Sequence, residues 1–132
     1  MNERTANWLE EANWDLENAM ILFDNKRFNT VVFHCQQAAE KAVKALLYHN
    51  KINGWGHSIH SLLEKYRDLK NANFKDIERI ALSLDKHYIT TRYPDALPNI
   101  APHNAYNQQE AELAIKQAKK IINFVNKEIN KD

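Results

Sequence analysis

The fold is decided by residues 28–50, FNTVVFHCQQAAEKAVKALLYHN, a stretch without glycine or proline. Because a helix turns by about 100° per residue, the apolar side chains of this stretch fall on one broad arc. They are Val31, Cys35, Ala38, Ala39, Ala42, Val43 and Leu46. This pattern predicts an amphipathic helix of roughly six turns that buries the arc in a protein core.

Helices are also predicted before and after this stretch, from apolar residues that recur every three or four positions. The first covers residues 5–23, with Thr5 as the N-cap for the free amides of its first turn. After residue 50, both glycines of the chain, Gly54 and Gly56, interrupt the helical pattern. A shorter third helix follows them, and Ser58 is its predicted N-cap.

The fourth and fifth helices each begin with an asparagine that is followed three residues later by an acid, a pattern typical of helix capping. Asn73 and Asp76 begin the fourth helix. It ends before Tyr93, because a residue that precedes proline avoids the α region. Asn107 and Glu110 begin the fifth helix, whose apolar positions continue almost to the end of the sequence.

The predicted fold class is all-α. Long amphipathic helices with short connections favour an antiparallel up-and-down bundle of four to five helices. The length of 132 residues suits one domain, so we expect residues 1–132 to form a single helical domain. Hydrophobic residues make up 44% and charged residues 27%, which argues against disordered, collagen-like and disulfide-scaffold classes.

Charge and cysteine content exclude further classes. Eighteen Lys and Arg against 17 Asp and Glu give a formal net charge of +1, so any contact with nucleic acid must be local. Cys35 is the only cysteine, which excludes an intrachain disulfide, and its place on the apolar arc favours a core residue over a nucleophile. No signal peptide or membrane-spanning run is recognisable, so we expect a cytoplasmic protein without a membrane partner.

The polar side of the 28–50 helix carries two apolar residues that the core arc does not explain. Phe33 and Leu47 lie there among Gln37, Glu40 and Lys44. One interpretation is a solvated face with a Glu40–Lys44 pair and two ordinary exposed apolar residues. We favour the other interpretation, in which Phe33 and Leu47 form a second apolar surface, and this predicts a homodimer.

The end of the fourth helix, SLDKHYITTRYPDA (residues 83–96), is dense in polar groups. Asp85, Tyr88 and Arg92 are three and four residues apart, so they fall on one side of the helix. They could be structural, with Arg92 paired to Asp85 or Asp95 at the helix end. They could instead form an anion subsite, since a guanidinium binds phosphate oxygens and a tyrosine can stack on a base.

Two histidines are candidate metal ligands. His57 and His60 are three residues apart and could contact one ion, but no Cys or Glu-x-x-His pattern completes a ligand set. A hydrogen bond from His57 to the glycine loop, residues 54–56, is favoured over metal binding. We therefore predict neither a metal nor a cofactor.

Three stretches together resemble the HEPN domain, the helical nucleotide-binding domain of prokaryotes and eukaryotes. They are FHCQQAAEKAVKALL (33–47), GHSIHSLL (56–63) and LDKHYITTRYPDA (84–96), followed by an alanine-rich closing helix. The resemblance covers about residues 5–126. It implies a helical bundle that is commonly dimeric and often encoded beside a minimal nucleotidyltransferase, as a two-component, toxin–antitoxin-like module.

The resemblance also implies a set of nucleotide-binding residues along a groove. Gln36, Gln37, Glu40, Lys41 and Lys44 match the glutamine-acid-lysine helix of the family, and His57 matches its glycine-histidine helix start. The implied nucleotide-binding set is Gln37, Glu40, Lys44, His57, Asp85, Tyr88, Arg92, Tyr93 and Asp95. By resemblance, the ligand is a nucleotide or RNA.

Some HEPN proteins are metal-independent ribonucleases, in which an arginine is followed four to six residues later by a histidine. Here the first histidine after Arg92 is His103, eleven positions on, and Arg79 precedes His87 by eight. Without the general acid/base partner at its family spacing, no catalytic residue is assigned, and a non-catalytic protein is favoured. The alternatives are a ribonuclease toxin that uses Arg92 with His87 or His103, and a purely helical assembly module.

Overall fold

A computed structural model describes residues 1–131, and all its regular elements are helices. No strand occurs within this range, and the predicted all-helical bundle is confirmed. The elements are α1 (Glu3–Asp24), α2 (Phe28–His49), α3 (Ile59–Lys70), α4 (Lys75–Asp85), α5 (His87–Thr90), the 3-10 helix η1 (Pro94–Ala96), α6 (Pro102–Ala105) and α7 (Gln108–Asn130).

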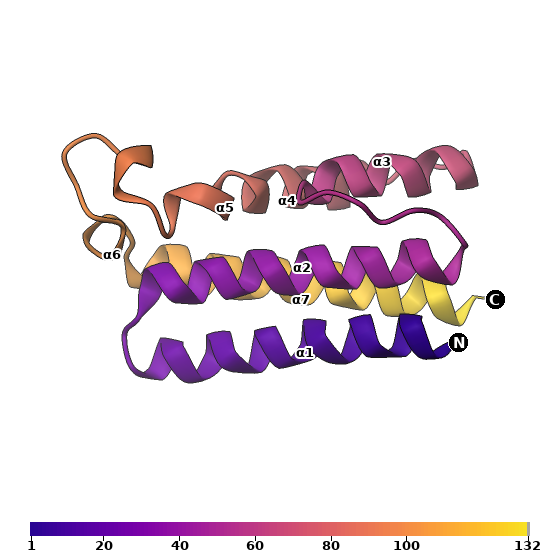
Figure 1. The fold of residues 1–132 in the computed structure, drawn as a ribbon, viewed down its shortest axis with the longest axis horizontal. Coiled ribbons are helices and arrows are strands. Elements are labelled where there is room, and N and C mark those ends of the chain that lie inside the picture. The colour runs from indigo at the N-terminus through magenta and orange to yellow at the C-terminus, as the bar shows by residue number, and fades with distance from the viewer. Residues whose placement is uncertain (132) are drawn as a thin grey trace.

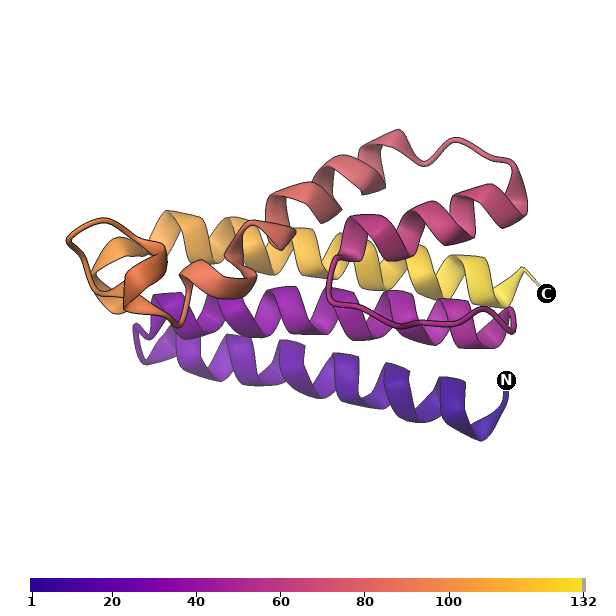
Figure 2. The ribbon, with the colours of Figure 1, turned by 45° about the horizontal axis from the view of Figure 1, so that its top comes forward.

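The three long helices form the body of the bundle, with α1 and α7 packed against α2 (Figure 1). Helix α1 runs antiparallel to α2, and α7 runs parallel to it. Helices α3 and α4 form a hairpin over the other side of α2, and the segment from α5 to α6 leads back to the start of α7 (Figure 2). The two ends of the described chain therefore lie at the same end of the bundle.

Helix α2 is the centre of the fold and is buried on nearly every side. Its expected core arc is confirmed, since Val31, Cys35 and Leu46 are all fully buried. The expected exposure of its polar side is wrong, because Glu40 and Lys44 are buried as well. The reason is that the loop after α2 covers Glu40, while α1 packs beside Lys44. No residue of α2 is fully exposed, and its remaining polar residues are only partly accessible to solvent.

Leu47 illustrates this correction. It is fully buried and belongs to the hydrophobic core, whereas Phe33 is only half-buried. The two residues therefore do not form one apolar surface, and the predicted dimer face made of Phe33 and Leu47 is wrong. A charge placed at Leu47 would sit inside the core and would unfold the protein rather than separate subunits.

Two of the expected helix starts are confirmed by their capping bonds, and two are not. The side chain of Ser58 accepts a hydrogen bond from the Ser61 amide, and Asn107 with Glu110 forms a complete capping box. The first helix is different, because Asn2 is its N-cap and accepts from the Thr5 amide at 2.8 Å. The expectation that Thr5 caps this helix is wrong, since the helix begins one turn earlier. The predicted Asn73–Asp76 cap is wrong as well, because Phe74 is the N-cap of α4 and Asn73, one residue earlier, accepts from the Lys75 amide.

The fourth expected helix is divided into α4 and α5 at Lys86. The hydroxyl of Thr90 donates to the Lys86 carbonyl at 3.1 Å, and that of Thr91 donates to the His87 carbonyl at 2.8 Å. Such side-chain bonds to the preceding turn compete with the backbone ladder and bend a helix. The expected end of the helix is confirmed, because Tyr93 has an extended backbone ahead of Pro94.

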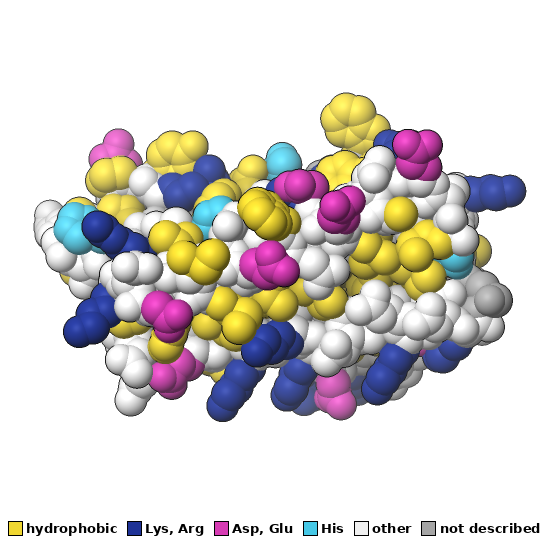
Figure 3. Space-filling model, turned by 90° about the horizontal axis from the view of Figure 1, so that it is seen from below, with side chains coloured by type: hydrophobic (Ala, Val, Ile, Leu, Met, Phe, Trp, Pro, Cys, Tyr) yellow, Lys and Arg dark blue, Asp and Glu magenta, His cyan; other side chains and the backbone are white. Residues whose placement is uncertain are grey.

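The outer face of α1 carries several exposed apolar side chains, Trp14, Met20 and Ile21 among them. In the view onto this face, hydrophobic side chains lie between rows of charged ones (Figure 3). Within residues 1–131, no helix combines the length and apolar character that a membrane crossing requires.

Candidate functional site

The floor of the site is a buried polar group on α2, formed by Gln36, Glu40 and Lys44. The Glu40 carboxylate is only 3% exposed. The Gln36 amide donates to it at 3.4 Å, and the Lys44 ammonium lies 3.6 Å from it. Gln36 also donates to the His57 carbonyl at 3.3 Å, which ties the loop after α2 to the helix. A buried carboxylate is stable here because it is paired and hydrogen-bonded.

His57 connects this buried polar group to the surface. Its ring Nδ1 lies 3.4 Å from the Glu40 carboxylate, and its ring stacks on Tyr88 with centroids 4.8 Å apart and planes 17° apart. The sequence had indicated that the His57 side chain bonds to the glycine loop. That prediction is wrong, because its partner is Glu40. Because the side chain is 61% exposed, the stacked pair presents an aromatic edge to solvent.

Arg92 lies next to this pair and is held by aromatic rings. Its Nη2 donates to the Tyr88 carbonyl at 2.6 Å, and its Nε donates to the same oxygen at 3.2 Å. The guanidinium carbon lies 4.2 Å from the ring centroid of Phe33 and 4.9 Å from those of Tyr88 and Tyr93. Phe33, His57, Tyr88, Arg92 and Tyr93 thus form one surface group, which we name the Arg92 cluster.

The two ion pairs considered for Arg92 do not form in residues 1–131. Its guanidinium is exposed and has no carboxylate partner in this part of the chain, neither Asp85 nor Asp95. The Nε and Nη2 edge of the guanidinium is occupied by the Tyr88 carbonyl, and the Nη1 side remains available for an anion. The cluster therefore offers a cation for a phosphate beside aromatic faces for a base.

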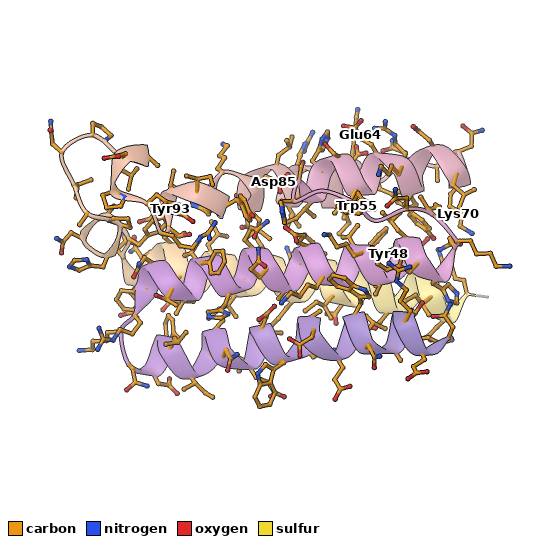
Figure 4. The ribbon with its side chains drawn as sticks, viewed as in Figure 1. Tyr48, Trp55, Glu64, Lys70, Asp85 and Tyr93 are labelled. Atoms are coloured by element: carbon orange, nitrogen blue, oxygen red, sulfur yellow. The ribbon has the colours of Figure 1, made fainter. Side chains whose placement is uncertain are left out.

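Asp85 has a structural task instead. One of its oxygens accepts from the Ile59 amide at 2.7 Å, and the other accepts from the Ser58 hydroxyl and the His60 amide, both at 3.0 Å. The carboxylate thereby satisfies free amides at the start of α3, where the helix dipole favours a negative charge. Asp85 joins the end of α4 to the start of α3, at mid-length in Figure 4.

Not all residues of the implied set come together. Gln37 donates to Gln36 at 2.7 Å and reaches the site only through it. Lys44 lies 5.4 Å from the ring centroid of Trp8, on the α1 side of Glu40. Asp95 is exposed on η1, and its side chain forms no hydrogen bond or ion pair with the cluster among the described residues. The set therefore separates into the surface Arg92 cluster, the buried polar group around Glu40 and outlying residues.

Sequence reasoning assigned Phe33 to a dimer contact and missed its place under Arg92. A signal was present, because Phe33 precedes Gln37 by four residues and Glu40 by seven, and so shares their helix face. Its contact with Arg92 depends on how α5 packs against α2, which helix periodicity does not predict.

The other candidate metal ligands and the single thiol have separate surroundings. His60 pairs with Glu64 at 2.8 Å, while His57 faces Glu40, so the two histidines have different partners. Residues 1–131 contain no group of three His, Cys, Asp or Glu side chains placed to hold a metal ion. Burial raises the pKa of the Cys35 thiol to about 12, which opposes formation of the reactive thiolate.

A second polar group lies between α1 and α2. Asp15 is 6% exposed, and its carboxylate lies 2.7 Å from the Lys41 ammonium and 3.5 Å from Nδ1 of His34. Burial raises the pKa of Asp15, but the hydrogen bonds from His34 and Lys41 outweigh it, so the pKa lies below its ordinary value. We call this group closed, since the Asp15 carboxylate is paired with Lys41 inside the fold.

Comparison with known proteins gives the following relationships. The family model of the HEPN domain matches residues 5–129. A protein of Methanocaldococcus jannaschii with the name "Putative toxin MJ1304" is 28% identical in an alignment 128 residues long that covers 89% of this chain and 83% of that protein.

Solved structures are similar over nearly the whole chain. TT1696 from Thermus thermophilus is 36% identical with a TM-score of 0.85, over 96% of this chain and 99% of that one. ST0689, an archaeal HEPN homologue, is 37% identical with a TM-score of 0.81, over 97% and 99%. A HEPN domain protein from Thermotoga maritima is 33% identical with a TM-score of 0.73, over 92% and 95%.

Proposed function

This chain belongs to the HEPN domain family, and from that premise we propose that it is a toxin-like HEPN protein that binds a nucleotide at the Arg92 cluster. The toxin-like part of the proposal is supported by the name of the Methanocaldococcus jannaschii relative. The nucleotide part is supported by the geometry of the cluster. The phosphate is bound by Arg92, and the base stacks on the neighbouring rings.

One observation carries the proposal, the exposed Arg92 guanidinium without a carboxylate partner in residues 1–131. A surface arginine that only locks a helix end is expected to pair with a nearby acid, and Asp85 is instead used by α3. Phe33 and Tyr88 hold the guanidinium in place before any ligand arrives. Less side-chain entropy is then lost when a phosphate binds.

The stacked pair of His57 and Tyr88 supports the base-binding part. Both rings are only partly covered, and aromatic faces bind bases without strong sequence preference. Glu40 orients the imidazole from below, at 3.4 Å. In this arrangement Glu40, Gln36 and Asp85 position the cluster, and they do not contact the ligand.

The test is calorimetric titration with nucleoside mono-, di- and triphosphates, together with incubation with labelled RNA. We expect binding that Arg92→Ala weakens about tenfold or more, because a charge-assisted contact is lost. Arg79→Ala is the matched control, since Arg79 is an exposed arginine of α4 outside the cluster. Equal affinity in the two variants would remove the proposed site.

The RNA arm separates binding from catalysis. Binding of RNA without cleavage agrees with the proposal. Magnesium-independent cleavage that is abolished by Arg92→Ala would instead favour a ribonuclease with a displaced site. In that case, His87 and His103 become the histidines to change next. His87 is bound to the Tyr106 hydroxyl at 2.8 Å, whereas His103 is exposed on α6.

We also propose that the protein is a homodimer and acts with a minimal nucleotidyltransferase encoded nearby. The family resemblance supports both statements. With Leu47 in the core, the best support for a contact surface is the outer face of α1, where Trp14 and Ile21 are exposed seven residues apart. Light scattering of the protein alone, and of the protein co-expressed with the neighbouring nucleotidyltransferase, tests the two statements separately.

A further inference from the structure

We propose a second ligand site where α1 begins and α2 ends, a pocket that binds one base and its phosphate in single-stranded RNA. The pocket has a volume of about 440 Å³ and lies between the start of α1, the end of α2 and the loop that follows. Arg4, Tyr48, Lys51, Asn53 and Trp55 contribute to its lining, and we name it the Trp55 pocket. Its size is within the range of small-ligand sites.

The loop is built in a way that keeps Trp55 in solvent. The Asn53 side chain accepts from the Trp55 amide at 2.9 Å, and Lys65 donates to the Asn53 carbonyl at 3.2 Å. Gly54 is buried so close to Tyr48 that a Cβ atom would lie 2.9 Å from the tyrosine ring. Gly56 has a φ of +107°, which side-chain-bearing residues rarely adopt.

The result of this loop geometry is an indole that is 80% exposed. Tryptophan is the largest aromatic side chain, and leaving it in water forgoes a large hydrophobic gain. Both glycines of the chain serve the short segment that presents it. An accessible indole next to a pocket provides a flat surface on which a base can stack.

The opposite wall of the Trp55 pocket combines an aromatic ring with a cation. The Arg4 guanidinium carbon lies 3.7 Å from the ring centroid of Tyr48, and Trp8 packs against the same tyrosine at 5.8 Å. Arg4 has no carboxylate partner within residues 1–131. The stacked guanidinium keeps its fork available for a phosphate.

The charge of the Trp55 pocket selects among planar ligands. Arg4 and Lys51 are the charged residues of its lining, and no acid lines it. Two cations beside two aromatic side chains suit a ligand that carries a flat ring and a negative charge in neighbouring positions. A base with its adjacent phosphate has this chemistry, in a free nucleotide or in an unpaired strand.

The distance between the two sites favours a strand. Phe33 of the Arg92 cluster and Tyr48 of the Trp55 pocket are fifteen residues apart on α2, which corresponds to about 22 Å along the helix. Figure 4 shows Tyr93 toward one end of the bundle and Trp55 with Tyr48 toward the other. The two sites adjoin along the loop, because Trp55 and His57 are two residues apart. A mononucleotide cannot span the whole length from Phe33 to Tyr48, but a short single strand can.

The test uses fluorescence anisotropy with a labelled single-stranded RNA of about ten adenosines and with labelled AMP. We expect Trp55→Ala to weaken RNA binding about tenfold, since base stacking on an aromatic side chain has an effect of that order. Arg4→Gln should weaken it as well and reduce its salt dependence. Leu113→Ala is the control, because Leu113 is 53% exposed on α7 and does not line the pocket.

The outcomes are distinct. Equal RNA affinity in Trp55→Ala and Leu113→Ala overturns the proposal. Binding of a polyglutamate peptide in place of RNA that depends on Trp55 overturns it as well. If AMP binding depends on Trp55 and RNA binds no more tightly than AMP, the ligand is a free nucleotide. The proposal that the pocket binds single-stranded RNA is then overturned. Because the Trp55 effect is also measured in an Arg92→Ala background, failure at the Arg92 cluster is separable from failure here.

Discussion

Two polar groups contact α2 from different sides, one closed and one open. On the α1 side, Asp15 is buried and paired with Lys41 at 2.7 Å. On the side of α5, the Arg92 guanidinium is exposed and rests on Phe33 and Tyr88 without an acid partner in residues 1–131. Both groups contain a charged side chain that helix periodicity alone would place on the polar surface.

The difference teaches how to separate structure from function in a small helical protein. A buried charge must be paired within the fold, so its loss is felt in stability. An exposed charge that is held in position but unpaired adds little stability and remains free for a ligand. Asp85 lies between the two cases, because it is close to the Arg92 cluster in sequence but serves the start of α3.

The largest stability effect is expected at the closed group. Asp15→Ala removes the partner of Lys41, and breaking a buried pair costs about 3–5 kcal/mol. Lys41 is about a quarter exposed and can be partly rehydrated, so we expect a loss of about 2 kcal/mol in the free energy of unfolding. Urea denaturation measures it, with the exposed Glu17→Ala of the same helix as the control. A loss equal to that of the control would contradict a closed pair.

The same pair predicts a pH dependence. Because the pKa of Asp15 in the folded protein is below its ordinary value of 3.8, its contribution to stability is present above that value. It is lost as the pH falls through the lower folded pKa. In melts between pH 6 and 2, Asp15→Asn should therefore lose less stability on acidification than the unchanged protein. Parallel curves would show that Asp15 titrates normally.

A smaller effect is expected at Asp85. Asp85→Ala removes the acceptor of three hydrogen bonds at the start of α3, and loss of a helix cap costs about 1–2 kcal/mol. Asp85→Asn retains a cap and should lose less. Thermal melts of both variants measure the effect, and hydrogen exchange of the first amides of α3 locates it. Unchanged exchange at Ile59 and His60 would refute the capping role.

The smallest stability effect is expected at Arg92. Arg92→Ala removes contacts with aromatic rings and two hydrogen bonds to the Tyr88 carbonyl, all of them at the exposed surface, so the free energy of unfolding should fall by no more than about 1 kcal/mol. Its effect should appear in nucleotide binding instead. A loss of stability as large as that of Asp15→Ala would mean that the Arg92 cluster is a second closed group, and the contrast between the two groups would disappear.

Several features of the fold could be predicted because they are local in sequence. Ser58, Asn107 and Glu110 bind amides three residues away, so their capping roles are visible in the order of the residues. Thr5 was misplaced because a second capping residue, Asn2, lies one turn earlier and the pattern does not choose between them. A shift of a helix end by a few residues changes little in the fold.

The candidate site was predictable only in part. Tyr88 and Arg92 were expected on one side of a helix, and they do lie together. The considered pair of Asp85 with Arg92 does not form, since the Asp85 carboxylate accepts hydrogen bonds from amides about 26 residues earlier in the chain. Neither the stack of His57 on Tyr88 nor the ring of Phe33 beneath Arg92 has a counterpart in residue spacing, because separate elements supply the two sides of each contact.

By itself, the sequence determined the helical class, the central helix and the family, because periodicity, caps and motifs depend on neighbouring residues. Only the tertiary structure decided that Leu47 is in the core, that Asp15 is closed by Lys41 and that Arg92 stays open. A helix face that reads as polar becomes interior when a loop and a second layer pack over it. The burial of a charge, and with it the choice between stability and binding, depends on that packing.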